Sequence, residues 1–204
     1  MDNLCAMTSN YLFLFVALLL CGSVFAQDDI PNTIRLENAG FEDEPSDATV
    51  PAGWHPCAEG TTPDILPGPW GVYNEPSEGD TFMGLISRQD GTWESVGQRF
   101  STPLLKNECY KFRVDLAHSK TYTGYNRPLK IRVYGGETRC DELQLIAKTG
   151  FVEHTDFRTY DFTFTPETDL NYIVIVAYYK SGWFSHMGNI LIDNLSVFKR
   201  CPRA

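Results

Sequence analysis

Short runs of β-branched and aromatic residues recur along this chain between turn residues, and this pattern limits the fold more than any other feature. The nine runs are Thr33–Glu37, Thr81–Ser87, Trp93–Ser101, Cys109–Ala117, Leu129–Gly135, Leu143–Thr149, Phe157–Thr165, Asn171–Tyr179 and Asn189–Phe198. Runs of this length at regular spacing are typical of the strands of a β-sandwich or barrel. No segment has a convincing helical period, although Asp141–Lys148 could form a short helix instead of a strand. The sequence therefore predicts an all-β fold of about nine antiparallel strands.

Alternation within these runs predicts which strands have one face in water. In 110–117 the apolar Phe112, Val114 and Leu116 alternate with charged residues that include Asp115, and 129–134 and 158–164 repeat the pattern. Ile173–Tyr179 is instead apolar on both faces, so we expect it to be a covered, central strand.

Residues 43–80 differ in composition from the rest of the chain, because they contain seven prolines and five glycines. Proline cannot donate to a strand ladder and glycine weakens a strand, so we expect mostly loop here. Long ordered loops inside a compact domain are often functional.

An apolar, uncharged run near the N-terminus predicts export. Residues 11–26 carry no charged side chain and end in small residues before a polar, acidic start at Gln27. This arrangement is typical of a secretory signal peptide cleaved after Ala26. The first ten residues carry Asp2 and no Lys or Arg, so Met7 could be the true start. Residues 1–26 are predicted to be a signal peptide, and the protein to be secreted, periplasmic or on the cell surface.

The remaining chain is long enough for one domain with its own core. Cleavage leaves 204 − 26 = 178 residues, and we expect 27–204 to form a single sandwich domain. Without Asp2 its charge is 17 − 25 = −8. An acidic protein without a Lys/Arg cluster is poorly suited to nucleic acid, and no second apolar run could span a membrane. We expect a monomer.

Four cysteines lie beyond the predicted signal peptide: Cys57, Cys109, Cys140 and Cys201. An even number in an exported protein predicts two disulfides, for which three pairings are open. We prefer Cys109 with Cys201, because a strand that starts at one could lie antiparallel to a strand that ends at the other. That leaves Cys57 with Cys140. Zinc is disfavoured by the wide spacings and the lack of a CxxC pair.

Segments at the two ends of the domain point to a known family. LENAGFE at 36–42 is followed by PAGW at 51–54, and ILIDNLSV occupies 190–197. Together they resemble the opening and closing of jelly-roll carbohydrate-binding modules with the galactose-binding-like fold. The segments Gly91–Gln98, Cys109–Phe112, Arg132–Gly136 and Ala177–Lys180 are similar to those of secreted Bacteroidetes proteins. The resemblance spans residues 33–198 and implies a jelly-roll β-sandwich.

The resemblance also implies a structural calcium between the first turn and the last strand. Glu42 and Asp193 match the carboxylates that hold it, with backbone carbonyls completing the oxygen shell. Two carboxylates are few for an ion that takes six to eight oxygens. The alternative is that Glu42 caps the turn and Asp193 binds loop amides without metal.

Aromatic side chains in or beside loops could stack on the apolar faces of sugar rings. They are Trp54, Trp70, Tyr73, Trp93, Tyr122, Tyr125, Tyr179, Trp183 and Phe184. The ligand-binding residues that we predict are Arg88, Trp93, Glu94, Tyr122, Tyr125, Tyr179 and Trp183, with Arg88 and Glu94 binding hydroxyl groups. Trp93 and Trp183 are the strongest candidates, because Gly and polar residues flank them. Each aromatic residue could instead belong to the β core, and we expect Trp54 to pack over the sandwich end.

Tyr122 and Tyr125 belong to a polar loop, His118–Arg127, that could close over a ligand or simply connect two strands.

We predict an exported carbohydrate-binding module without catalytic activity, whose ligand is a glycan or polysaccharide. A structural or adhesive protein-binding module is the second hypothesis. A glycan-active enzyme is the third, since carboxylate pairs such as Glu94 with Asp115 arise by chance in an acidic chain. The sequence contains no GxSxG, HExxH or Gly-rich phosphate loop.

Overall fold

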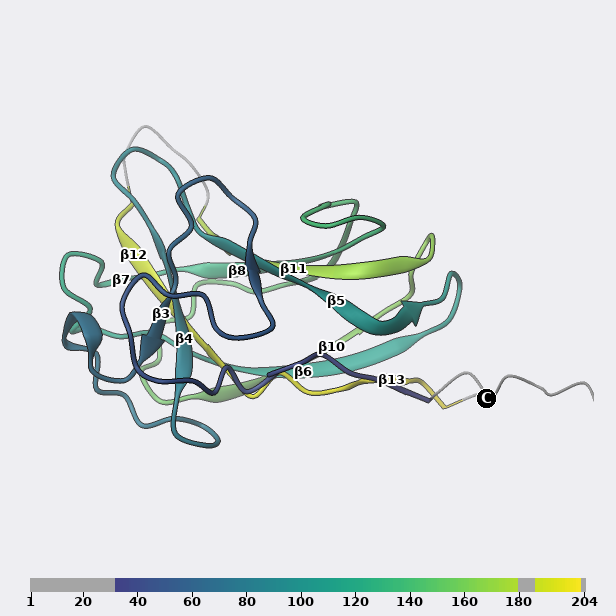
Figure 1. The fold of residues 1–204 in the computed structure, drawn as a ribbon, viewed down its shortest axis with the longest axis horizontal. Coiled ribbons are helices and arrows are strands. Elements are labelled where there is room, and N and C mark those ends of the chain that lie inside the picture. Colours follow the sequence, from purple (N-terminus) through teal and green to yellow (C-terminus); the bar gives the residue numbers. More distant parts are fainter. Residues whose placement is uncertain (1–31, 180–185, 203–204) are drawn as a thin grey trace, which may run out of the picture. The chain divides into compact units, whose positions relative to one another are not determined.

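Two facing sheets make up the described part of the chain, which is residues 32–179 and 186–202 of a computed structural model (Figure 1). The predicted signal peptide, residues 1–26, lies outside the described residues. Sheet A has the order β1 (Thr33–Ile34), β13 (Phe198–Arg200), β6 (Tyr110–Ala117), β12 (Gly188–Asp193), β4 (Phe82–Ser87), β3 (Asp64–Leu66). In addition, β10 (Arg158–Phe164) pairs with β6, and β7 (Arg127–Pro128) pairs with β12.

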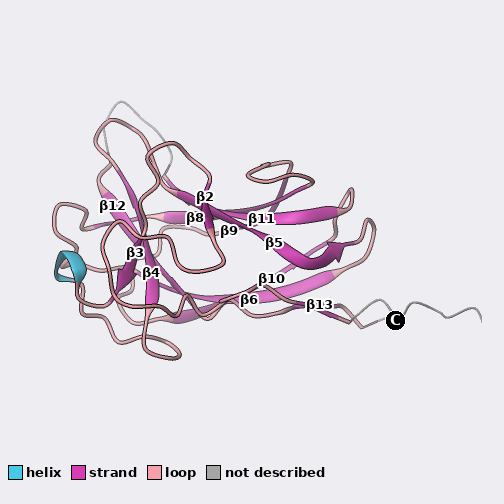
Figure 2. Ribbon diagram, in the orientation of Figure 1, coloured by secondary structure: helices cyan, strands magenta, loops and turns pink. Residues whose placement is uncertain are grey.

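Sheet B has the order β2 (His55–Pro56), β5 (Ser95–Leu104), β11 (Leu170–Tyr178), β8 (Lys130–Gly136), β9 (Gln144–Lys148). Every pairing is antiparallel except the short one between β7 and β12. Strands and loops account for almost all of the described residues, with one short 3-10 turn, η1 (Pro69–Gly71), at one end (Figure 2). The predicted all-β jelly-roll sandwich is confirmed. No helix in the described residues is long and apolar enough to cross a membrane.

The alternation in the sequence correctly predicts the core between the sheets. Phe112, Val114 and Leu116 of β6 are buried there, as are the apolar residues of β8. The all-apolar β11 is the central strand of sheet B, between β5 and β8. Asp115 is the exception, because it is buried although the alternation places it on the wet face. It accepts a 2.5 Å hydrogen bond from the Ser77 hydroxyl in the loop that covers it.

Of three expectations about individual segments, one needs correction. Residues 43–80 are mostly loop, as predicted, with the short β2, the fully buried β3 and the turn η1 within them. The run 189–198 is not one strand, because Asn194 adopts a positive φ of 47° and separates β12 from β13. The segment 141–148 ends in a strand, β9, and not in a helix.

A second, smaller core lies on the side of sheet A that faces away from sheet B. It consists of Leu66, Val72, Phe82, Ile86, Ala117, Tyr122 and Leu191. The loops at 67–74 and 119–125 cover these side chains. Both loops are therefore packed against the sheet and have apolar side chains beneath them.

The structure contains both disulfides of the preferred pairing, Cys57–Cys140 and Cys109–Cys201. Cys201 N also donates to Cys109 O over 2.9 Å, which continues the β13–β6 ladder to the bridge. A ring nitrogen of His55 and the sulfurs of Cys57 and Cys140 lie within 4.8 Å of one another, close enough to share a metal ion. Both sulfurs are used in the disulfide, however. The first turn and the last strand lie side by side as the resemblance implies, since Leu195 N donates to Ala39 O over 3.0 Å.

Candidate functional site

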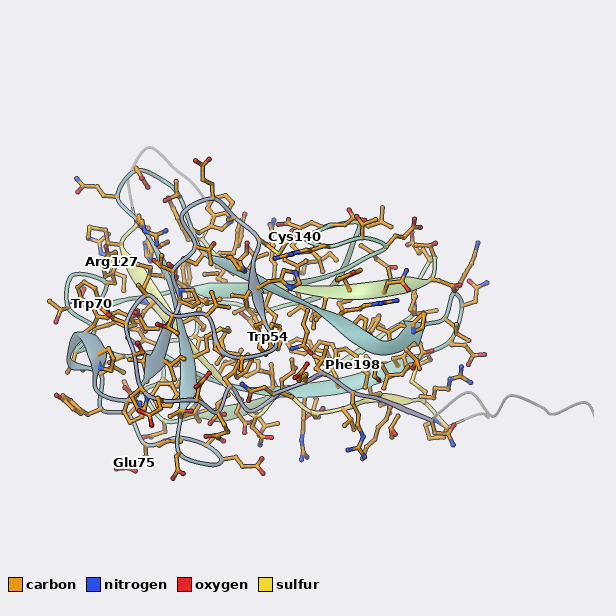
Figure 3. The ribbon with its side chains drawn as sticks, in the orientation of Figure 1. Trp54, Trp70, Glu75, Arg127, Cys140 and Phe198 are labelled. Carbon is orange, nitrogen blue, oxygen red and sulfur yellow. A yellow bond between two sulfur atoms is a disulfide. The ribbon has the colours of Figure 1, made fainter. Side chains whose placement is uncertain are left out.

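Four segments form a hollowed surface on the second core, which we call the loop face: residues 45–47, 69–77, 119–121 and 155–157. A hollow of about 620 Å³ lies between 73–77, 119–121 and 155–157. A second hollow of about 530 Å³ lies between 45–47 and 69–70. Figure 3 shows Trp70 and Glu75 toward the end of the sandwich that is away from Phe198 of β13. The segment 69–77 contributes to both hollows.

The indole of Trp70 is exposed but fixed in position. Its side chain is 45% exposed, and its Nε1 donates to Asp64 Oδ1 over 3.2 Å. Asp64, on β3, is almost completely buried; it also accepts a 2.8 Å bond from Ala48 N and a bond from the Tyr122 hydroxyl. Burial raises the pKa of Asp64, and these three hydrogen bonds oppose the rise. One buried carboxylate thus ties together three loops around Trp70.

The backbone of Trp70 is strained. Its φ of 54° and ψ of 15° lie in the left-handed region, which bulky side chains rarely occupy. Such a conformation costs about 1–3 kcal/mol and persists only where its surroundings impose it. Here Thr123 N and the Thr123 hydroxyl both donate to Trp70 O, at 3.0 and 2.9 Å. Strain at an exposed aromatic residue points to a function in presenting that side chain.

The neighbouring loop 119–125 is fixed by Asn189 of β12, which is fully buried. Its side-chain oxygen accepts from Ser119 N over 2.8 Å, and its Nδ2 donates to Ser119 O and Tyr125 O, both at 2.7 Å. The Thr121 hydroxyl donates to Gly71 O over 2.6 Å, which joins this loop to η1. The loop face therefore has a preorganised backbone.

Tyr73 provides a second aromatic surface in the larger hollow. It is 75% exposed, the highest value among the exposed large hydrophobic side chains of the described chain. Glu75, Lys120 and Asp156 line the same hollow and offer charged hydrogen-bonding groups. Asn74 Nδ2 donates to Thr155 O over 2.8 Å and joins two walls of the hollow. An exposed ring beside such groups matches what a sugar ring and its hydroxyl groups need.

Two predicted ligand residues, Tyr122 and Tyr125, lie beneath the loop face and not on it. Tyr122 is only 1% exposed and belongs to the second core. Its burial raises its pKa well above the ordinary value, and the Asp64 carboxylate raises it further. Tyr125 is half-buried and meets the rings of Trp70 and Tyr122 edge to face, at 6.4 and 6.2 Å. Both tyrosines support Trp70, because their loop folds back onto sheet A.

Arg88 and Glu94 bind each other. Arg88 Nη2 lies 2.5 Å from Glu94 Oε1 and also donates to Gly60 O and Thr62 Oγ1. Glu94 is 0% exposed, and its carboxylate accepts from the amides of Thr62 and Ile86 at 2.9 and 3.0 Å. Burial raises the pKa of Glu94. In this arrangement the carboxylate cannot reach a ligand, and the pair instead fixes the 58–62 loop.

Trp93 and Tyr179 lie near each other at the end of sheet B. Trp93 is half-buried and contacts Tyr178 and Tyr179 edge to face, at 6.1 and 6.3 Å. Tyr179 is 4% exposed and belongs to the main core, so its ring is not a ligand surface. Trp183 lies outside the described residues. Trp54 packs on Phe41 at 5.1 Å and is buried, as we expect from the sequence.

Glu42 and Asp193 both accept hydrogen bonds from the loop at 77–81. Glu42 Oε2 accepts from Asp80 N and Thr81 N, each at 3.1 Å, and Asp193 Oδ2 accepts from Ser77 N over 2.7 Å. Among the described residues, neither belongs to a group of three acidic, His or Cys side chains within metal-ligand distance. A calcium ion here would take most of its oxygens from carbonyl groups and water. Calcium at Glu42 and Asp193 stays a prediction.

The sequence gives only a partial signal for the loop face. Trp70 and Tyr73 are visible as aromatic residues in a Pro/Gly-rich stretch, but nothing local separates them from buried ones. The run PGPWG at 67–71 is the useful signal, because Gly68 and Gly71 both adopt positive φ around the exposed indole. The role of Asp64 could not be predicted from the sequence, because its hydrogen-bond donors Ala48, Trp70 and Tyr122 come from three different segments.

Comparison with known proteins supports the fold. The sequence matches no family model, and no curated protein matches it. An apo form cyclase from Fischerella sp. has a TM-score of 0.54 at 17% identity, covering 84% of this chain and 97% of that one. The CBM22-1 xylan-binding domain of Paenibacillus barcinonensis Xyn10C has a TM-score of 0.50 at 12% identity, covering 81% and 94%.

The K2 cleaved adhesin domain of Lys-gingipain also has a TM-score of 0.50, at 11% identity, covering 79% of this chain and 96% of that one. Identities this low establish a shared fold only. The chain therefore has the β-sandwich fold that also occurs in a xylan-binding domain, an adhesin domain and a cyclase.

Proposed function

We propose that the loop face binds carbohydrate and that the protein is an exported, non-catalytic carbohydrate-binding module. The observation that carries the proposal is the fixed, strained and exposed Trp70, with the exposed Tyr73 three residues further on. A sugar that stacks on an aromatic ring removes apolar area from water. Because the loops are already ordered, little conformational entropy is lost on binding.

The charge of the loop face favours a neutral polysaccharide. Glu75, Asp156 and Lys120 line one hollow, and Asp47 lines the other, so carboxylates outnumber cations there by three to one. These carboxylates can accept hydrogen bonds from sugar hydroxyl groups, but they repel uronic acids and sulfate esters. Xylan is a sensible first probe, since a xylan-binding domain shares the fold.

The observations also bear on catalysis and location. The raised pKa values of Asp64 and Glu94 come from burial in hydrogen-bonded positions, and neither carboxylate is open to a substrate. We therefore expect binding without turnover, which product analysis after long incubation with the ligand can check. Two disulfides fit an oxidising compartment, in line with export.

The test is binding of the full chain to immobilised neutral polysaccharides, with xylan and β-glucan as the first two. We expect retention on at least one of them, and we expect Trp70→Ala and Tyr73→Ala to weaken it by about tenfold or more. Phe151→Ala is a matched control, because Phe151 is 44% exposed but lies outside the loop face. Absence of retention on every neutral polysaccharide would overturn the proposal.

A protein-binding, adhesive function is the second candidate. Its supporting observation is that Leu143, just before β9, and Leu145, within it, are 52% and 41% exposed; β9 is an edge strand of sheet B. Exposed apolar side chains on a strand edge are a common protein-docking feature. This function predicts that Leu143→Ser abolishes adhesion to a protein-coated surface while polysaccharide binding stays the same.

A further inference from the structure

A hollow of about 400 Å³ on the outer face of sheet B has the opposite charge to the loop face. Its lining residues are Lys130, Ile131, Arg132, Lys148, Thr149 and Tyr178. Lys130 and Arg132 come from β8, Lys148 from the edge strand β9 and Tyr178 from the end of β11. Three cations thus surround one small hollow on a protein whose formal net charge is −9. We call it the basic hollow; β8 and β11 can be followed in Figure 1.

Contacts with aromatic rings hold two of the cations. The Arg132 guanidinium carbon lies 3.5 Å from the centroid of the Tyr178 ring, and its Nη1 donates to the Tyr134 hydroxyl over 3.3 Å. Lys130 Nζ lies 4.4 Å from the centroid of the Phe151 ring. A guanidinium that stacks over a ring can still donate from its remaining N–H groups to an oxyanion.

The three cations of the basic hollow form no close ion pair within the described chain. None of the three cations has an ion-pair partner within 4 Å among the described residues. Arg132 and Lys148 are directly opposite each other in the β8–β9 ladder, where like charges destabilise a sheet. Glu142 is the acid that Arg132 influences: burial raises its pKa, and the charge of Arg132 opposes the rise. A bound anion would relieve the repulsion between Arg132 and Lys148.

The stacked guanidinium also limits what the hollow can bind. Arg132 covers one face of the Tyr178 ring, and the rings of Trp93 and Tyr178 meet edge to face. The ring face under Arg132 is closed to a stacking sugar, while an oxyanion meets two or three donors. We propose that the basic hollow is a second binding site, which takes a carboxylate or sulfate group on an acidic saccharide.

The proposal is tested by binding the full chain to polygalacturonate, which supplies carboxylates, and to dextran sulfate, which supplies sulfates, with dextran as the neutral control. We expect binding to at least one anionic polymer and to no dextran, with an affinity that falls as salt rises. Arg132→Gln and Lys148→Gln should each weaken it by about tenfold, as expected for a lost charge-assisted hydrogen bond. Glu142→Gln should strengthen it.

The control is Lys106→Gln, which removes the same charge from an exposed site near the start of β11, at the other end of sheet B from Tyr178. Its affinity should equal that of the unchanged protein. Thermal melting checks folding, and Lys148→Gln, at an exposed position, keeps the test valid if Arg132→Gln unfolds. No binding to either anionic polymer at low salt overturns the proposal, and so does an equal loss in Lys106→Gln.

The proposals for the loop face and for the basic hollow can be tested independently. Trp70→Ala and Tyr73→Ala change the loop face alone and should leave anionic polymer binding unchanged. Arg132→Gln and Lys148→Gln should leave retention on neutral polysaccharide unchanged. If the unchanged protein binds only one of the two kinds of polymer, the proposal for the other site is wrong.

Discussion

Trp70 Nε1 donates a 3.2 Å hydrogen bond to Asp64 Oδ1, so a buried carboxylate sets the orientation of an exposed indole. The same carboxylate accepts from Ala48 and Tyr122. The loop face thus depends on one residue of β3, a strand inside a stretch that composition alone marks as loop. This dependence makes the account testable at a position that no ligand touches.

Asp64→Asn should destabilise the protein and weaken carbohydrate binding together. An amide offers one acceptor oxygen in place of two, so at least one buried donor loses its partner, at a cost of about 1–3 kcal/mol in the free energy of unfolding. Urea denaturation measures this cost, and retention on polysaccharide measures the second effect. The exposed Asp161→Asn, outside the loop face, serves as the control, and a similar loss of stability there would contradict the prediction.

Stability should fall as pH rises through the titration of Asp193. Burial is the main cause that raises its pKa from 3.8 to about 6, and the charge of Glu42 adds to this. In that window the folded protein holds a proton that the unfolded chain releases. The free energy of unfolding therefore decreases with rising pH, by at most about 3 kcal/mol for this group.

Urea denaturation at about pH 4 and about pH 7 measures this decrease. Asp193→Asn should remove that part of the pH dependence, whereas Asp161→Asn, at an exposed position, should retain it. If the pH dependence of stability is unchanged in Asp193→Asn, it arises from acids other than Asp193.

Arg88→Met should destabilise the protein by about 3 kcal/mol, because it leaves the fully buried Glu94 without its charged partner. Polysaccharide binding by the folded fraction should be unchanged, since the pair lies outside the loop face. Adding Glu94→Gln should restore part of the stability, which denaturant titration of the double variant measures. Loss of binding without loss of stability would instead restore Arg88 to the ligand site.

Calcium should raise the midpoint of thermal unfolding if Glu42 and Asp193 hold it as predicted. The comparison is between about 1 mM calcium and excess chelator, a range that covers extracellular calcium sites. Glu42→Gln should remove the increase, and Glu44→Gln, at an exposed neighbour, should not. Equal midpoints of thermal unfolding in calcium and in chelator would contradict calcium binding. Glu42 and Asp193 would then serve only to accept hydrogen bonds from loop amides.

Local pattern was sufficient to predict an all-β fold, and the resemblance to jelly-roll modules specified the sandwich. The alternation around Phe112 and the all-apolar β11 depend on which side chains avoid water, and each is visible within one strand. The turn at Asn194 was missed because β-branched residues continue on both sides of it. Asn194 has a positive φ, and its side-chain amide donates a hydrogen bond to Asp115, which is 79 residues away in sequence.

The candidate site was harder to predict because its contacts are not local. Tyr122 lies in a polar segment that reads as a rim, yet its hydroxyl reaches Asp64, 58 residues earlier, and its ring is buried. Glu94 reads as a ligand acceptor, but amides from two other segments surround it. Charged or aromatic character alone does not reveal whether a side chain faces solvent or a partner.

Affinity electrophoresis of the folded protein in gels containing neutral polysaccharide shows directly whether Trp70 and Tyr73 form the binding surface. The unchanged protein and Phe151→Ala should be retarded. Trp70→Ala and Tyr73→Ala should each migrate about as in a gel without polysaccharide, while circular dichroism shows them folded. Retardation of all four proteins to the same extent, or of none in any neutral polysaccharide, would contradict carbohydrate binding by the loop face.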